Sequence, residues 1–264
     1  MRTPGRIAVI VGIGAAAGAL GMWAAGGTWQ DIQHLGQPRN VMIVDGESVR
    51  VPVTVSDGER LAPEVAVSTS GAHTFLFEEN GEPTRYDPCV AHAWVYNPEG
   101  MPEGADGLVA EAFDNIAQYT GLVFSHEGNV DEPADFDRPL IQEEYGDRFA
   151  PILVGWSDEA TTPGLEGTTA GLGGSSSVTG AFGQERFLAA GVVILDSEDF
   201  TNVLATDGGR DRAASIIRHE IAHVVGLGHV EDESEVMHTQ NLAAVTWGPG
   251  DRQGLAIAGA GPCQ

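Results

Sequence analysis

Apolar residues recur at helical spacing in two stretches of the chain. The first stretch predicts a helix that ends at Thr120 and Gly121, because glycine suits a left-handed C-terminal cap. The second stretch, DRAASIIRHEIAHVVG at residues 211–226, predicts another long helix that ends at Gly226. The apolar face of the first helix comprises Leu108, Val109, Ala112, Phe113, Ile116 and Ala117.

Four further stretches alternate apolar and polar residues or form short apolar runs, as strands do. They cover residues 92–97, 122–128, 150–157 and 189–198. The glycine- and serine-rich stretch TTAGLGGSSSVTG, residues 168–180, suits a flexible edge or a loop beside a cleft. The order of strand, helix, strands, helix and short irregular tail predicts an α+β domain whose sheet packs on two helices.

The N-terminus has a pattern of its own. Two arginines precede an uncharged run rich in Ala, Gly, Ile and Val from Ile7 to Gln30, which is the order of an export signal. Ala24 and Gly26 suit the small-residue positions before a cleavage point. The run also has the roughly 18–20 residues that an uncleaved anchor needs. Residues 1–27 are therefore predicted to be a signal peptide or a membrane anchor, and the protein to be secreted or anchored at the cell surface.

Residues 28–80 alternate apolar and polar positions around turn residues such as Asp57-Gly58. This pattern predicts a stalk or a short pro-like segment with some strand character, and it assigns the segment no function. The firmer pattern of helices and strands lies in residues 81–264, which we expect to form the main domain.

Composition narrows the class of partner. The formal net charge is −25, so no basic face is available to neutralise nucleic-acid phosphates, and we expect no nucleic-acid partner. The acidic surface also repels anionic lipids, which leaves the N-terminal anchor as the one expected contact with a membrane. Export permits a disulfide between the two cysteines, Cys89 and Cys263, and a closed loop of that length stabilises a fold by ~4–5 kcal/mol. A pair of free thiols is the alternative.

The stretch HEIAHVVGLGH, which begins at His219, carries the chemistry. His219 and His223 are four residues apart in a helical pattern, so both imidazoles project from one face and can bind one metal ion. Glu220 can reach a water on that ion without being a ligand. Gly226 lets the chain leave the helix, and His229 follows three residues later, where it can swing back as a third ligand. A buried helix that happens to be rich in histidine is the alternative.

The full pattern HExxHxxGxxH resembles the zinc site of the metzincin metalloproteases, in which a Met-turn follows. The interval from His229 to Met237 is similar to that of the matrixins, as is the segment GPGDRQGLAIAG, which holds Asp251, Gly254 and Leu255. The upstream stretches YDPC, VYNPEG and TGLVF resemble small exported matrixin-like proteases of bacteria.

This resemblance implies that residues 81–264 are a metalloprotease catalytic domain of α+β fold, in which a twisted mixed sheet packs on two long helices. It places the zinc site on the second helix and a short subdomain at the C-terminus. By position, His219, His223 and His229 would bind zinc. Glu220 would be the general base and Met237 the Met-turn residue.

The implied activity is that of an exported zinc-dependent endopeptidase. Three neutral histidines leave an open fourth position on zinc, where the pKa of a bound water falls toward about 7. Glu220 accepts the proton of that water as it attacks a peptide carbonyl, and then passes the proton to the leaving amine. Protein or peptide substrates would pair with an edge strand near residues 168–177, and a disordered surface loop is the alternative for this stretch. We expect a monomer.

Three features depart from the matrixin pattern. Val230 stands where matrixins have a small hydroxyl residue, and His238-Thr239 follow Met237 in place of an aromatic residue and a proline. The sequence holds no PRCGxPD-like cysteine switch, so latency through a thiol lacks support unless Cys89 provides it. The first two departures bear on subfamily and specificity and leave the metal chemistry intact.

Two other functions stand as alternatives: a non-catalytic, zinc-stabilised extracellular binding module and a degenerate protease. A structural zinc site usually has four protein ligands, and only three are evident here, which counts against the binding module. The presence of Glu220, the expected general base, counts against both alternatives. Calcium is a second candidate cation, at the acidic residues 131–137 or 195–199, and solvated loops are the competing interpretation. His238 is expected to be a neighbour of the metal site. The remaining histidines are expected to be surface or core residues, namely His34, His73, His92 and His126.

Overall fold

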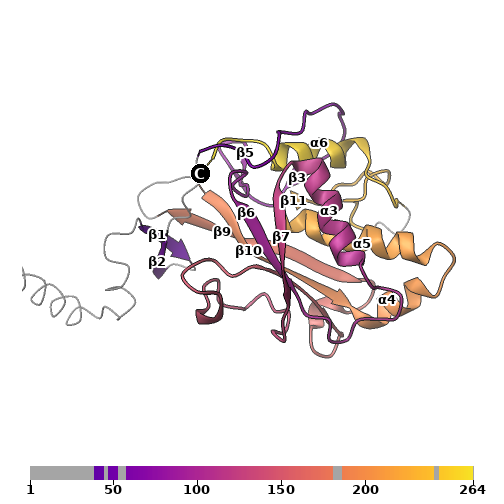
Figure 1. Ribbon diagram of the computed structural model, residues 1–264. Coiled ribbons are helices and arrows are strands. Elements are labelled where there is room, and N and C mark those ends of the chain that lie inside the picture. The colour runs from indigo at the N-terminus through magenta and orange to yellow at the C-terminus, as the bar shows by residue number, and fades with distance from the viewer. Residues whose placement is uncertain (1–38, 45–46, 53–57, 181–185, 241–243, 264) are drawn as a thin grey trace, which may run out of the picture. The chain divides into compact units, whose positions relative to one another are not determined.

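The computed structural model describes residues 39–44, 47–52, 58–180, 186–240 and 244–263 (Figure 1). Apart from Arg39, these residues belong to one compact unit, Asn40–Gln264. The predicted signal peptide or anchor, residues 1–27, and the candidate His34 lie outside the described residues. Within the described ranges, no helix is long and apolar enough to cross a membrane.

A mixed sheet of seven strands forms the framework of the compact unit. The strands are β1 (Arg39–Val44), β2 (Glu47–Pro52), β6 (Ala91–Tyr96), β7 (Val123–Asn129), β8 (Ile152–Ser157), β9 (Gly171–Gly180) and β10 (Arg186–Asp196). Their order in the sheet is β2-β1-β9-β10-β8-β6-β7. Strands β10, β8, β6 and β7 run parallel, whereas β9 is antiparallel to both β10 and β1.

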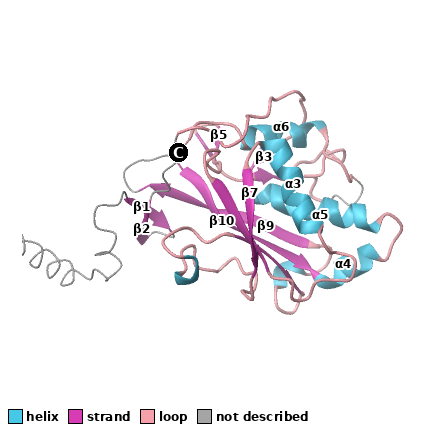
Figure 2. Ribbon diagram, viewed as in Figure 1, coloured by secondary structure: helices cyan, strands magenta, loops and turns pink. Residues whose placement is uncertain are grey.

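The described residues include four α-helices: α3 (Leu108–Thr120), α4 (Ser197–Leu204), α5 (Gly209–Val224) and α6 (Pro249–Ala258). Helices α3 and α5 correspond to the two predicted helices and lie side by side against the sheet (Figures 1 and 2). The end predicted for α3 is present, since Gly121 adopts a φ of +70° and donates its N–H to the carbonyl oxygen of Ala117. Short 3₁₀ helices occupy Glu143–Tyr145 and Pro163–Leu165.

The apolar faces of α3 and α5 meet the sheet in one core. Phe113 and Ile116 of α3, Ile217 and Ile221 of α5, and Leu195 of β10 are all buried in the same cluster. Close packing of these side chains fixes the rotation of α5 about its own axis. The direction in which the other faces of α5 point is thereby fixed as well.

Three elements differ from the sequence prediction. The strand expected at residues 189–198 ends at Asp196, because the Asp196 carboxylate accepts the N–H of Asp199 at 2.7 Å and so caps α4. The expected irregular tail contains α6, which has Pro249 in its first turn, where proline is tolerated. The stretch at residues 168–180, expected as a flexible edge or a loop, is mostly the regular strand β9.

Residues 58–80, predicted to belong to a stalk or pro-like segment, pack on the main domain. Phe75 and Phe77 contact the core cluster that includes α3 and α5. The short strands here are β3 (Thr74–Phe75), which pairs antiparallel with β11 (Leu227–Gly228), and β4 (Glu78–Glu79), which pairs with β5 (Glu82–Pro83). Residues 74–77 of the predicted stalk or pro-like segment therefore contact the domain that is predicted to begin at residue 81.

The C-terminal end of the compact unit is tied to earlier parts of the chain. Cys89 and Cys263 form a disulfide, with their Cα atoms 5.3 Å apart. Arg60 donates to the carbonyl oxygens of Gly259 and Gly261, at 2.9 and 3.2 Å, just beyond the end of α6. The C-terminal segment is thus held against residues from the N-terminal side of the unit.

Candidate metal centre

Helix α5 carries the first two histidines of the motif on one face. Ile217 and Ile221 point into the core, and His219 and His223 lie one turn apart at neighbouring positions. After the helix ends, Gly226 adopts a φ of +102°, which favours glycine over other residues. This turn reverses the chain into β11, directly before the third histidine.

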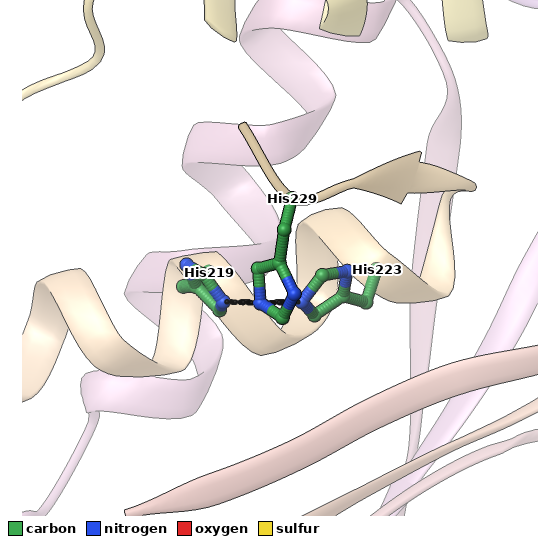
Figure 3. A group of neighbouring side chains, drawn as sticks. All are labelled: His219, His223 and His229. Carbon is green, nitrogen blue, oxygen red and sulfur yellow. Dashed lines mark hydrogen bonds between the residues drawn. The ribbon is translucent and has the colours of Figure 1, made fainter. Parts of the chain in front are cut away.

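The third histidine joins the first two, as Figure 3 shows. His219 and His223 project from α5, and His229 reaches toward them from the segment that follows β11. The Nε2 atoms of His219 and His223 are 3.0 Å apart, and each lies 3.1 Å from the Nε2 atom of His229. Three ring nitrogens thus converge on one point.

Two of the rings have a defined tautomer. The Nδ1 atom of His219 lies 2.7 Å from the carbonyl oxygen of Val236, and that of His223 lies 2.7 Å from the carbonyl oxygen of Leu227. A carbonyl oxygen only accepts, so each Nδ1 carries the proton and each Nε2 presents a lone pair. Burial lowers the pKa of His219 to about 4 and that of His223 to about 3, which keeps both rings neutral at pH 7.

This arrangement fits a bound cation. Two unprotonated Nε2 atoms cannot hydrogen-bond to each other, so the short contact between His219 and His223 brings lone pairs together. Neutral imidazole is a favoured ligand of zinc, and nitrogens about 3 Å apart can all contact one ion at about 2.0–2.1 Å. Among the described residues, the group that could hold a metal ion consists of three imidazoles, His219, His223 and His229.

Glu220 is buried beside this group, with 6% of its surface exposed. Burial raises the pKa of its carboxyl to about 8. Strand β9 passes directly against it, because a Cβ atom on Gly171 would lie 2.8 Å from Glu220 Cγ. A Cβ atom on Gly173 would lie 2.1 Å from the carbonyl oxygen of Glu220. Sequence reasoning missed the role of these two glycines, although alternate glycines in a strand indicate the close approach of another backbone.

The side chain of Met237 is buried, and the backbone around it forms hydrogen bonds with the residues that carry the histidine motif. The carbonyl oxygen of Met237 accepts the N–H of Val230 at 3.0 Å, directly after the third histidine. The preceding residue, Val236, supplies the carbonyl oxygen that orients the ring of His219. The segment predicted as the Met-turn therefore contacts both the helix and the loop that carry the motif.

Two buried carboxylates hold this turn against α6. Asp251 accepts the N–H groups of Val236, Met237 and Gly248, at 2.5, 3.2 and 2.9 Å. Glu235 accepts the N–H groups of Gly250 and Asp251, both at 2.8 Å. Burial raises the pKa of Asp251 to about 6, and the charge of Glu235 contributes in the same direction. The role of Glu235 had no signal in the sequence.

The other histidines described here lie outside the three-histidine group. The Nδ1 atom of His238 accepts a hydrogen bond from the backbone N–H of Gln240. Burial lowers the pKa of His229, and the neighbouring His238 lowers it further by a smaller amount. His73 contacts the carbonyl oxygen of Gly71, and His92 that of Asp87. His126 stacks on Trp94 with ring centroids 3.9 Å apart.

The acidic stretches considered for calcium have other partners. In residues 131–137, both carboxylate oxygens of Glu132 accept hydrogen bonds from Arg138, with further bonds from Gln142 and Tyr145. In residues 195–199, Asp196 caps α4. Among the described residues, neither stretch provides a group of three metal-ligand side chains, so the calcium prediction gains no support.

Among the described residues, one edge of β9 is largely unpaired near Glu220. On that edge β1 pairs only with Thr179 and Gly180, through Ile43 and Met42. Within the part of the chain that the structure describes, no strand pairs with residues 171–178 on the same edge.

No family model matches the chain, and no curated protein matches it. Among solved structures, the GM1-bound form of the ECX AB5 holotoxin overlaps with a TM-score of 0.31 and 13% identity, over 57% of this chain and 57% of that chain. This chain thus spans little more than half of the holotoxin chain. Archaemetzincin from Methanopyrus kandleri overlaps with a TM-score of 0.34 and 18% identity, over 62% of this chain and 86% of that chain. Both TM-scores are too low to establish a shared fold.

Proposed function

We propose that this protein is an exported, zinc-dependent endopeptidase of the matrixin-like metzincin type. The observation that carries the proposal is the convergence of three imidazole Nε2 atoms within 3.1 Å, two of them on rings whose Nδ1 protons are held by carbonyl oxygens. The donor set consists of neutral nitrogens and leaves a position for water or substrate, as in catalytic zinc sites.

His219, His223 and His229 would hold the zinc ion. When bound in such a site, zinc supplies Lewis acidity and lowers the pKa of a water to about 7. Glu220 would accept the proton of the attacking water and return it to the leaving amine. Its burial against the glycines of β9 restricts its contact with bulk water and its freedom to move. A cation held by the three histidines would lower the raised pKa of this carboxyl and favour the carboxylate form that accepts the proton. The hydrogen bonds from Nδ1 of His219 and His223 to carbonyl oxygens would hold both rings in the orientation that presents Nε2 to a metal ion.

An extended peptide would bind along the open edge of β9. Residues 171–178 offer backbone N–H and C=O groups on that edge, and Gly171 lies against Glu220. A substrate strand that pairs there gains main-chain hydrogen bonds without requiring a particular sequence. This placement brings a scissile peptide bond of a protein or peptide substrate toward the proposed general base.

The matrixin-like assignment rests on the spacing of Met237 and on Asp251. Met237 belongs to a turn that contacts the His219 ring through Val236 and the chain beyond His229 through Val230. Asp251, at the start of α6, accepts two N–H groups of that turn. Both features correspond to the positions at which the sequence resembles the matrixins.

The substitution Glu220→Gln tests the proposed base, because it preserves the shape of the side chain and removes the proton acceptor. We expect the variant to retain zinc and to cleave a mixed peptide library about 10²–10⁴-fold more slowly than the wild type. The matched control is Glu103→Gln, at an exposed glutamate. Equal cleavage by Glu220→Gln and wild type would remove Glu220 from the mechanism. Zinc binding without cleavage by either protein would favour the zinc-stabilised binding module.

A further inference from the structure

A short segment from the N-terminal side of the main domain lies against the loop that carries the third histidine. In the β3–β11 pair, Phe75 is opposite Leu227 and Thr74 is opposite Gly228. The N–H of Leu76 donates to the carbonyl oxygen of Gly226 at 2.9 Å. Residues 74–76 therefore lie alongside the turn that connects α5 to His229 and contact its backbone.

Thr74 contacts the third histidine directly. Its hydroxyl group donates to the carbonyl oxygen of His229 at 2.8 Å. That carbonyl belongs to the same planar peptide group as the N–H of Val230, which donates to the carbonyl oxygen of Met237 at 3.0 Å. The peptide that follows the third histidine is thus held at both ends, by Thr74 on one side and by the Met-turn on the other.

The position of the Thr74 hydroxyl is itself well determined. Thr74 and Leu76 are exposed, whereas Phe75 and Phe77 alternate with them and contact the core. A Cβ atom on Gly228 would lie 2.6 Å from the Thr74 hydroxyl oxygen, so the glycine is needed for this approach. Packing of the phenylalanines and the absence of a side chain at residue 228 together fix where the hydroxyl donates.

The third histidine depends on such support more than the other two. His219 and His223 lie on one helix, and a carbonyl oxygen fixes each ring at Nδ1. His229 is exposed and follows a loop, and among the described residues its Nδ1 has no hydrogen-bond partner. Its ring is therefore placed mainly by its backbone, which Thr74 contacts.

We infer that Thr74 is a positioning residue of the metal centre, and that residues 74–76 complete the site from outside the catalytic domain expected from sequence. The same segment supports a second ligand, because Leu227, opposite Phe75, supplies the carbonyl oxygen that orients His223. The inference rests on the proposed function only in so far as the three histidines bind a metal ion.

Two substitutions in the full chain separate the hydroxyl from the shape of the side chain. Thr74→Val removes the hydroxyl and keeps the branched shape, whereas Thr74→Ser keeps the hydroxyl. We expect Thr74→Val to raise the zinc dissociation constant about tenfold, measured by competition with a chelator, and to change the visible absorption spectrum of the cobalt-loaded protein. Thr74→Ser should restore both. Thr201→Val is the matched control, since Thr201 donates to a backbone carbonyl on α4, away from the motif.

A second pair of variants tests the backbone contact. Leu76→Pro removes the N–H that donates to Gly226, whereas Leu76→Ala keeps it and shortens the same exposed side chain. We expect weaker zinc binding in the proline variant alone, with thermal unfolding of the metal-free proteins as the check on folding. Zinc affinities equal to wild type in both Thr74→Val and Leu76→Pro would overturn the inference and leave the proposed function standing. Failure of the wild type to bind zinc would overturn both.

Discussion

Backbone carbonyl oxygens orient two of the three imidazoles that we propose as metal ligands, and other residues hold one of those carbonyls in place. The carbonyl oxygen of Val236 accepts from His219, and the N–H of the same residue donates to Asp251 at 2.5 Å. Asp251 also accepts from Met237, so it fixes the backbone on both sides of the Val236 carbonyl. The buried carboxylate of Asp251 on α6 therefore influences the orientation of His219 through the backbone of Val236.

The substitution Asp251→Asn should weaken both the fold and the metal site. An amide cannot accept on its nitrogen side, so at least one of the three N–H groups that contact Asp251 loses its partner. We expect the free energy of unfolding of the metal-free protein to fall by about 1–3 kcal/mol in chemical denaturation, with weaker zinc binding. Asp114→Asn, at an exposed position on α3, should change neither quantity. A variant at residue 251 with wild-type stability and zinc affinity would contradict this role.

The residues of the HEIAHVVGLGH stretch could be assigned roles because their relations are local. Two histidines one turn apart and a glycine that reverses the chain follow from helix geometry alone. Thr74 could not be identified in that way, since it contacts His229 across a separation of 155 residues. Glu235 was hidden for the same reason, because its partners Gly250 and Asp251 belong to a helix that follows later in the chain.

Strand β9 is difficult to recognise from the sequence because its close contact with α5 requires small residues on one face. Gly171 and Gly173 face α5, where a Cβ atom would collide with Glu220. Ser175, further along the same face, donates its hydroxyl to the carbonyl oxygen of Val224 at the end of α5. The face of β9 that packs on the helix therefore has no apolar side chains here, and the alternation that marks a strand is absent from the sequence.

Adding a single methyl group to this face should displace the helix. In Gly173→Ala the new Cβ atom would lie 2.1 Å from a backbone oxygen of Glu220, which cannot move as a side-chain tip can. We expect a loss of about 1–3 kcal/mol in the free energy of unfolding and a lower rate of peptide cleavage. Gly174→Ala is the matched control, because its Cβ atom would meet only Phe136, at 3.6 Å. Equal stability of the two variants would show that β9 and α5 are not in close contact.

The periodic spacing of apolar residues was sufficient to predict the helices and strands that bury apolar side chains. Helices α3 and α5 and the strands β6, β7, β8 and β10 were predicted because the spacing of their apolar residues matches a helix or a strand. Helix α4 was not predicted, because its beginning depends on the cap formed by Asp196 rather than on a long apolar face.

At the scale of the whole molecule, the compact unit is closed by contacts between segments far apart in the chain. The disulfide joins Cys89 to Cys263 across 174 residues, a length for which loop entropy gives ~4–5 kcal/mol of stabilisation. Residues 74–76 contact the loop before His229, and Arg60 contacts the end of the chain. Composition and pattern indicated an α+β domain, but which segments wrap around it depends on such distant contacts.

The most direct test of the central claim is metal removal and return in the full chain. Zinc per chain would be measured by mass spectrometry together with hydrolysis of a mixed peptide library, before chelation, after chelation and after zinc is restored. We predict about one zinc per chain, loss of cleavage on chelation, and recovery with one equivalent of zinc. A chain that binds no zinc, or whose cleavage is indifferent to zinc removal, would contradict the assignment of His219, His223 and His229 as a catalytic metal site.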